Sequence, residues 1–265
     1  MIRLLTEWDR QRTIDFLRAA PEYNLYTLGN IERIGFAHEL TQYWGDFDEA
    51  GVLRGVLNRY MQGWVIFGAT TSDWAAFGQI VDTHATTAQR LQDNPGGLVS
   101  FLPYLHRYEA ARVSIQHLMA LEAANFAAAP TPRPNVLVRR ATLADLPQLV
   151  DFYAAAGHMA RAKAAVEQPL QSTRLWLAEK QGEILSAALT NAETADLAMV
   201  GGVYTKPDAR QQGLSRAVCS ALCGELLALG RRPVLYWETA AAGAVYFRLG
   251  FHNVGEWRSV RLQNK

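Results

Sequence analysis

A segment in the second half of the chain joins a glycine-containing turn to two arginines. Residues Val203 to Arg216 read VYTKPDARQQGLSR, after a strand-like run and before a helix-like one. The first backbone N–H groups of a helix lack partners within it, and the helix dipole favours negative charge at that end. The turn therefore predicts a cradle for a pyrophosphate, to which Arg210 and Arg216 add cationic charge.

The same turn resembles the hallmark motif of the GNAT acyltransferases, R/Q-x-x-G-x-G/A. Residues Arg210 to Ser215 fit every position except the last, where Ser215 replaces Gly or Ala. The added hydroxyl occupies a position that the family keeps small but can itself donate to an oxygen, so the departure implies weakened or adjusted binding. Further along, Tyr246 to Phe251 (YFRLGF) resembles the family's Y-x-x-x-G-F ending.

The resemblance implies acetyl-CoA as cosubstrate and no metal. In this family the pantetheine arm of the cofactor lies between two splayed strands, as an added strand would. Backbone groups at the end of the first strand would bond the arm, and amides of the following turn would take the diphosphate. The arm-binding residues are then Val203, Tyr204 and Thr205, and the diphosphate-binding ones are Arg210, Gln211, Gln212, Gly213, Leu214, Ser215 and Arg216.

Acyl transfer to an amine needs a held thioester, a deprotonated amine and a proton for the departing thiolate. Tyr246 stands where the family commonly has a tyrosine that acts as general acid, and a phenol of pKa near 10 suits that role. The alternative is a tyrosine that only packs on a short helix.

The general base is less well marked in the sequence. The expected strand at 197–204 contains no acid, so Glu238, at the exit of the next strand, is our first choice. Glu193 and Asp196 flank the start of the 197–204 strand, and each of the three is also a plausible solvated loop carboxylate. His158 falls in the loop that borders the acceptor site in this family.

Two functions of different classes fit these residues. The first is an acetyl-CoA-dependent N-acetyltransferase that moves an acetyl group to a primary amine of a small molecule or peptide by direct attack on the thioester. The alternative is a catalytically inactive acyl-CoA-binding or regulatory protein. The absence of an acid from the 197–204 strand and the serine at position 215 would both fit this alternative. An NAD or ATP domain fits poorly, since neither G-x-G-x-x-G nor G-x-x-x-x-G-K-S/T occurs at a strand-to-helix junction.

Periodicity and turn signals in the second half predict the element order of that family. The expected strands are 136–140, 175–179, 184–190, 197–204, 233–237 and 258–262, and the expected helices are 142–155, 160–168, 215–229 and 241–249. Three prolines within 127–135 favour an extended linker. The predicted domains are therefore 1–126 and 136–265, joined by the linker 127–135.

The first half repeats the pattern without the cradle. Its expected helices are 10–20, 22–32 and 74–84, and its expected strands are 41–47, 52–60, 64–68, 98–101 and 112–121. After 64–68 comes ATTSDW, which lacks both the arginine and the spaced glycine. We therefore expect an α/β (α+β) chain of two tandem GNAT-like domains, each with a mixed, mostly antiparallel sheet flanked by helices, the first degenerate; an unrelated first domain is the alternative. The aromatic segment 23–30 would line an acceptor pocket or form an amphipathic helix.

Composition narrows the class of partner. The 265 residues carry 26 Lys and Arg against 25 Asp and Glu, which gives no reason to expect binding to nucleic acid or to a membrane surface. Apolar runs are too short for a bilayer span, so we expect a cytoplasmic protein, monomer or homodimer. Cys219 and Cys223 lie four residues apart on one helix face without a completing His or Cys, so we expect them to be buried apolar groups.

Overall fold

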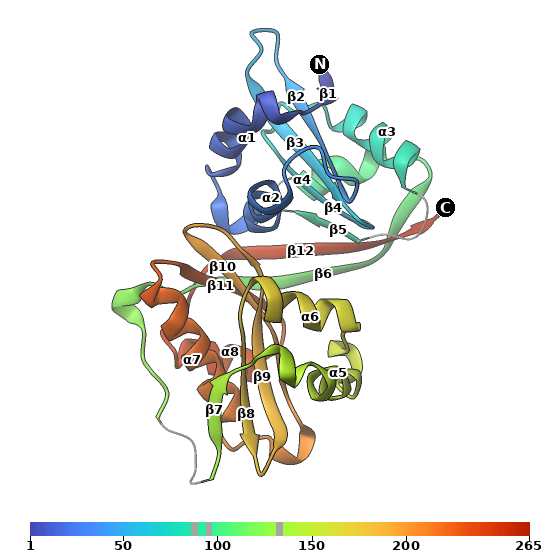
Figure 1. The fold of residues 1–265 in the computed structure, drawn as a ribbon. Coiled ribbons are helices and arrows are strands. Elements are labelled where there is room, and N and C mark those ends of the chain that lie inside the picture. Colours follow the sequence, from blue (N-terminus) through green and yellow to red (C-terminus); the bar gives the residue numbers. More distant parts are fainter. Residues whose placement is uncertain (86–89, 94–96, 131–134) are drawn as a thin grey trace. The chain divides into compact units, whose positions relative to one another are not determined.

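The computed structural model describes residues 1–85, 90–93, 97–130 and 135–265, which form two compact units (Figure 1). The first unit comprises Met1–His117 and Gly255–Lys265, and the second comprises Leu118–Val254. Each unit combines a mostly antiparallel sheet with helices, which confirms the predicted fold class.

The first unit contains seven described strands and four described α-helices. The strands are β1 (Ile2–Leu4), β2 (Thr41–Phe47), β3 (Leu53–Tyr60), β4 (Gly63–Gly68), β5 (Arg90–Asp93) and most of β6 (Tyr108–Ala120) and β12 (His252–Asn264), in the order β1-β2-β3-β4-β5-β12-β6. The helices are α1 (Arg10–Leu17), α2 (Pro21–Ile34), α3 (Trp74–His84) and α4 (Gly97–Phe101). Strand β4 pairs with β5 in parallel, and β12 pairs with β5 in antiparallel.

Most elements expected in the first half form, but the strand predicted at 98–101 is wrong. That segment belongs to the short helix α4, and β1 and β5 were not anticipated. A four-residue apolar run is too short to show a period, so sequence alone does not separate a helical turn from a strand there. The structure places Phe101 fully inside the core with Phe77 and Tyr108.

The second unit holds the elements expected after residue 136, except the strand at 258–262, which belongs to β12 in the first unit. Its strands are β7 (Leu137–Arg140), β8 (Leu175–Lys180), β9 (Glu183–Glu193), β10 (Leu197–Thr205) and β11 (Arg232–Trp237), in the order β11-β10-β9-β8-β7. Its α-helices are α5 (Leu146–Ala154), α6 (Lys163–Ser172), α7 (Leu214–Ala228) and α8 (Ala240–Phe247). Strands β7 to β10 pair in antiparallel, and β10 pairs with β11 in parallel.

The second sheet has helices on both faces (Figure 1). One face packs against α7 and α8 through Val200, Val218 and Leu249, and the other packs against α5 and α6 through Tyr153, Val166 and Leu189. This three-layer arrangement buries an apolar core on each side of the sheet. It also fixes the end of β10 beside the N-terminus of α7.

Both predicted cysteines lie in the α7 layer. Cys219 and Cys223 are free and fully buried, as expected from their spacing. Burial raises the pKa of Cys219 to about 12 and raises the pKa of Cys223 well above its ordinary value. Both therefore stay protonated and act as small apolar groups.

The compact units do not end where the predicted domains do. The chain divides at His117 and Val254, because the last strand β12 pairs with β5 and contributes Gly255–Lys265 to the first unit. Of the predicted linker 127–135, residues 131–134 lie outside the described part. The described portion packs on the second unit, where Ala127 N donates to Leu249 O at 3.0 Å and Ala129 N donates to Ser220 Oγ at 2.8 Å.

Each unit has the same Arg-x-x-Thr-x-x-Asp motif before its first α-helix, and the sequence analysis did not recognise this repeat. Arg3 donates two hydrogen bonds to Asp9, at 2.8 and 2.6 Å, and Thr6 N donates to the same carboxylate at 3.0 Å. Arg139, Thr142 and Asp145 reproduce it at 2.9, 2.7 and 2.8 Å, with a capping box in both cases. The same capping box and bidentate pair thus recur at identical spacing in the two units.

The pKa values of these two carboxylates predict that the free energy of unfolding falls in acid. Hydrogen bonds from Arg3 and Arg139 lower the pKa of Asp9 and of Asp145 to about 2 from the ordinary 3.8. Because the folded pKa is the lower one, each pair is fully stabilising above about pH 4 and loses its contribution as pH falls toward 2. We expect Asp145→Asn to cost roughly 2 kcal/mol at pH 7 and almost nothing near pH 2.

Urea unfolding of wild type and Asp145→Asn between pH 7 and pH 2.5 measures this difference. Asp9→Asn should give the same pH dependence in the first unit. A cost for Asp145→Asn that stays constant over the whole range would show that the ion pair does not stabilise the fold.

Candidate active site

The turn before α7 has the backbone geometry of an anion cradle. Gln211 (φ 59°) and Gly213 (φ 78°) are both left-handed, and Gly213 is the residue before the first turn of α7. Within the described part of the chain, no backbone N–H of residues 211–216 donates a hydrogen bond, and the side-chain amide of Gln212 donates to Asp208 O at 3.4 Å. A Cβ placed on Gly213 would meet no atom within 4 Å, so this side of the turn is open.

Three arginines surround the turn. Arg210 donates from Nε to Thr205 O at 3.3 Å, and Arg216 donates from Nη2 to Arg248 O at 3.2 Å. The Nε atom of Arg216 is buried and lacks a hydrogen bond. None of these three arginines forms an ion pair with a described residue, so the unpaired amides lie in a cationic setting suited to a diphosphate.

Strands β10 and β11 part beside the turn. Their parallel register runs from Leu197 opposite Arg232 to Met199 opposite Val234 and ends there among the described residues, although β10 continues to Thr205 and β11 to Trp237. The rest of β10 thus has a paired edge toward β9 and an open edge toward β11. An open edge can take an extended ligand as an added strand.

The register with β9 shows which backbone groups face the open edge. Lys206 N donates to Leu185 O at 2.9 Å, and Tyr204 lies opposite Ala187, so these two residues bond toward β9. Backbone groups of alternate strand residues point to opposite edges, so Val203 and Thr205 point toward β11. Tyr204 instead contributes its side chain to the α5 face, where its hydroxyl donates to Ala155 O at 3.3 Å.

Strand β10 is irregular at Gly201 and Gly202, which the sequence analysis did not single out. The register with β9 shifts between Gly201 and Tyr204, and Gly202 has a φ of 58°. The hydroxyl of Tyr153 donates to Gly202 O at 2.7 Å, and a Cβ on Gly201 would overlap the side chain of Asn191. Two consecutive glycines inside an apolar strand were the sequence signal for such a bulge.

Tyr246 lies on α8 with its ring inside the α7 layer. It is 7% exposed, packs edge-on against Phe251 at 5.9 Å, and its hydroxyl has no hydrogen-bond partner among the described residues. Burial raises its pKa above the ordinary value, with smaller contributions from Cys219 and Cys223. The phenol is therefore a proton-bearing donor at neutral pH.

The three candidate bases fall in different surroundings. Glu238 is exposed between β11 and α8, directly before Thr239, which caps α8. Glu193 is paired with Arg174 and with Arg231, the latter at 2.5 Å. Glu193 and Asp196 also lie at the start of β10, about 25 Å of strand away from Thr205. Of the three carboxylates, only Glu238 directly follows the unpaired end of β11.

His158 and the aromatic segment 23–30 were also named from the sequence. His158 is exposed in a 3-10 turn, Gly157–Met159, between α5 and α6. The aromatic segment 23–30 forms part of α2 in the first unit, where Leu25 and Leu28 are buried and Asn24 donates from Nδ2 to Leu17 O at 2.9 Å.

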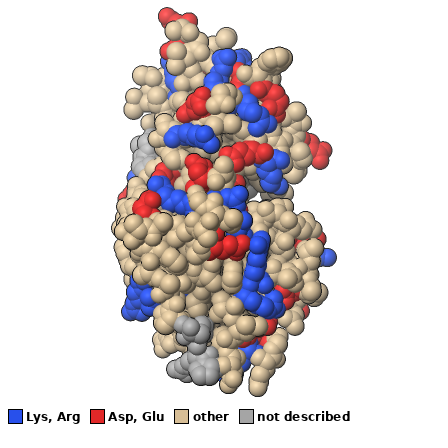
Figure 2. Space-filling model, turned by 60° about the vertical axis from the view of Figure 1, so that its left-hand side comes forward, with Lys and Arg blue, Asp and Glu red and all other residues tan. Residues whose placement is uncertain are grey.

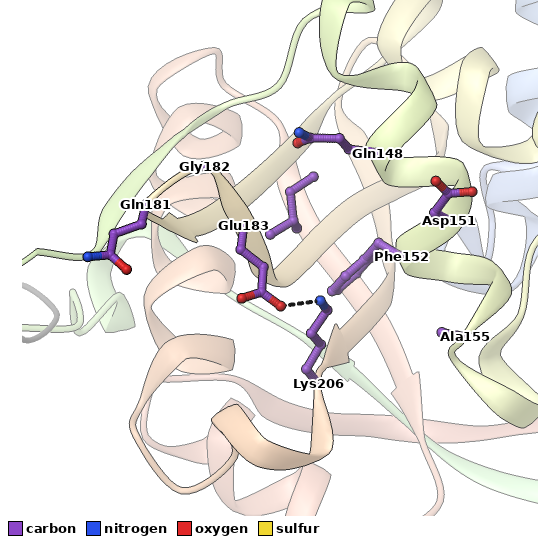
Figure 3. Close-up of a pocket in the computed structure, with 9 residues that line it drawn as sticks. Gln148, Asp151, Phe152, Ala155, Gln181, Gly182, Glu183 and Lys206 are labelled. Atoms are coloured by element: carbon purple, nitrogen blue, oxygen red, sulfur yellow. Dashed lines mark hydrogen bonds and ion pairs between the residues drawn. The ribbon is translucent and has the colours of Figure 1, made fainter.

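A cavity of about 390 Å³ opens on the α5 face of the second unit (Figure 3). Its wall includes Phe152 and Asp151 of α5 and the β8–β9 turn. Lys206 donates to Glu183 at 2.6 Å across this wall. Because α7 covers the other face of the sheet, this cavity is distinct from the cradle.

The corresponding turn of the first unit is closed. Strand β4 is followed by Asp73 at the start of α3, and the Asp73 carboxylate accepts from Ala76 N at 3.0 Å. Asp73 N itself donates to Asp46 at 2.8 Å. Two carboxylates thus occupy the helix N-terminus at which a phosphate would need unpaired amides, and like charge would repel it.

Charge over the surface is mixed. Figure 2 shows Lys and Arg side chains interspersed with Asp and Glu on the face drawn. No helix in the described ranges is long and apolar enough to cross a membrane, and no group of three or more His, Cys, Asp or Glu in those ranges is arranged to hold a metal ion.

Comparisons with known proteins agree with this fold. Residues 179–262 match the family model of FR47-like protein, and no curated protein sequence gives a significant match. A Drosophila melanogaster protein is 14% identical with a TM-score of 0.76 and covers 98% of each chain. A GCN5-related N-acetyltransferase from Sphaerobacter thermophilus is 16% identical, with a TM-score of 0.68 over 100% of this chain and 95% of that one. A tandem GNAT protein from the clavulanic acid biosynthesis pathway is 13% identical, with a TM-score of 0.64 over 100% and 98%.

Proposed function

Because the chain has a tandem GNAT-like fold and residues 179–262 match the FR47-like family model, we propose that its second unit is an acetyl-CoA-dependent N-acetyltransferase. The observation that carries the proposal is the row of unpaired amides at residues 211–216 beside the open edge of β10. The diphosphate binds these amides together with Arg210 and Arg216. The pantetheine arm runs back along the edge formed by Val203 and Thr205.

The reaction is direct transfer. The neutral amine attacks the thioester carbonyl, its nitrogen forms the new bond to carbon, and the carbon–sulfur bond breaks. The nitrogen gives up a proton to Glu238 through water, and the sulfur leaves as a thiolate that Tyr246 stabilises by donating a hydrogen bond or its proton. Burial raises the pKa of Cys219 as well as that of Tyr246, so a thiolate in these surroundings is also more basic than in water.

One observation favours the alternative of an inactive acyl-CoA-binding protein. The described part of β10 beyond Met199 carries no carboxylate, and the exposed Glu238 forms no ion pair with a described residue. A protein with the cradle but without a base would bind the cofactor and not turn it over. We further propose that the first unit binds no second acetyl-CoA, since Asp73 and Asp46 occupy the N-terminus of α3.

The test measures binding and turnover separately. We expect acetyl-CoA to raise the melting temperature, one molecule to bind per chain, and free CoA to appear when suitable amines are added, with kcat rising as the amine deprotonates. Binding without CoA release over a broad amine panel would support the regulatory alternative. An absence of binding would overturn both functions.

A further inference from the structure

Arg161 is held beside the irregular part of β10 by neutral groups. It lies just before α6 and is half-buried, and its Nη2 donates to Asn191 Oδ1 at 3.0 Å. Its guanidinium carbon lies 5.8 Å from the ring centre of Tyr153. A Cβ on Gly202 would come within 3.1 Å of Arg161 Nε, so the missing side chain at Gly202 leaves room for the guanidinium.

No described carboxylate pairs with Arg161, although most other half-buried arginines of the second unit have one. Ion pairs are formed by four half-buried arginines of this unit, namely Arg139, Arg174, Arg231 and Arg232. Among the described arginines of the second unit, those without an ion pair are Arg210, Arg216 and Arg248 around the cradle, and Arg161. A half-buried guanidinium held only by an amide and a ring still has donors for a planar anion.

Arg161 lies near the proposed thioester end of the cofactor rather than near its diphosphate. Gly202 precedes Val203 and Thr205, so an arm that enters from residues 211–216 and runs back along β10 reaches Gly202 at its thioester end. Arg161 lies on the α5–α6 side of this strand, away from the α7 layer that holds Tyr246. A ligand bonded to Arg161 therefore faces the end of the arm from the side opposite the leaving-group donor.

Building on the proposed acetyltransferase function, we propose that Arg161 binds the carboxylate of the acceptor, so that the acceptor is an amine that also carries a carboxylate group. The guanidinium offers two parallel N–H donors, the geometry that a carboxylate accepts. Asn191 and Tyr153 position the guanidinium, and Arg161 takes no part in bond making. Free amino acids and short peptides both present this chemistry.

Matched acceptors test the proposal by CoA release. Each set contains an amino acid, its carboxamide and its decarboxylated amine, for example phenylalanine, phenylalaninamide and phenethylamine, with a dipeptide to separate free amino acids from peptides. We expect wild type to prefer the carboxylate member at least about tenfold in kcat/KM. Arg161→Gln should lower kcat/KM for that member about 10- to 100-fold and leave the carboxamide unchanged.

Two variants and one binding measurement complete the design. Arg161→Lys should restore part of the preference, and Arg140→Gln, which removes an exposed arginine of the same unit, should leave it unchanged. The acetyl-CoA-induced rise in melting temperature should be the same in Arg161→Gln as in wild type, which separates this site from the cradle. Equal kcat/KM across each set, or an equal loss for all members in Arg161→Gln, would overturn the assignment of Arg161.

If acetyl-CoA binds but no amine is acetylated, the enzyme proposal fails while Arg161 stays testable. The amino acid would then be titrated into the CoA-bound protein and followed by its own thermal shift. A shift in wild type that disappears in Arg161→Gln would support a carboxylate site, and no shift in wild type would overturn it.

Discussion

Replacing Gly213 by leucine should abolish the stabilisation of the protein by acetyl-CoA. At a concentration about 100 times Kd, the cofactor should stabilise wild type by about 2.7 kcal/mol, a rise of roughly 6–10 °C in melting temperature. The Cβ of residue 213 points into open space at the mouth of the cradle, where the diphosphate is proposed to lie. A leucine side chain there would occupy the phosphate site and remove most of this shift, as measured by thermal denaturation with and without acetyl-CoA.

The other end of the same helix provides a matched control. Gly230, just after the C-terminus of α7, has a φ of 72°, and a Cβ there would also meet no atom within 4 Å. Gly230→Leu should therefore cost the same backbone strain, about 1–2 kcal/mol, without touching the ligand. We expect both variants to melt earlier than wild type and only Gly230→Leu to respond to acetyl-CoA. A full cofactor shift in Gly213→Leu would remove the cradle from the proposed function.

The closed turn of the first unit explains why the two halves should differ in binding although they share a fold. Both halves have a helix after the corresponding strand, but in the first the carboxylate of Asp73 already accepts from an amide of α3. In the second, Gly213 has no side chain and the amides stay unpaired. We therefore expect the difference between a glycine and an aspartate at this helix N-terminus to decide whether an anion binds there.

Local patterns in the sequence predicted most of the elements and the position of the turn before α7. The α3 helix was predicted at its observed bounds, and the turn at Gln211 to Gly213 was expected from its glycine and the arginines around it. Both features depend on residues close together in the chain, where periodicity and turn chemistry act. The residue-by-residue roles in cofactor binding stay predictions.

Features that depend on distant residues could not be predicted in this way. The gap between β10 and β11 arises from where their pairing stops, and the contacts of Arg161 join a loop, Asn191 of β9 and Gly202 of β10. The pairing of β12 with β5 joins the C-terminal strand to residues 90–93 and places Gly255–Lys265 in the first unit. A single sequence does not show which segments meet in space, so these arrangements required the structure.

Replacing Tyr246 by phenylalanine should lower kcat at least about 100-fold while acetyl-CoA still binds, because the variant loses a proton donor but keeps the ring packing. The phenol has no other hydrogen-bond partner among the described residues, so its removal should cost little stability. Tyr108→Phe is the matched control. Its buried hydroxyl donates to Ala85 O at 2.7 Å in the first unit, so this variant should lose about 1 kcal/mol of stability and retain kcat.

The pH dependence of kcat gives a second measurement of the same role. Because burial raises the pKa of Tyr246, its proton should stay in place through the whole accessible range, and kcat in wild type should show no fall near pH 10. An ordinary exposed phenol would ionise near pH 10 and produce such a fall. A descending limb near pH 10 that vanishes in Tyr246→Phe would mean that the hydroxyl is solvated like an exposed one. Unchanged turnover in Tyr246→Phe would mean that the tyrosine only packs against α7 and that the thiolate takes its proton from water.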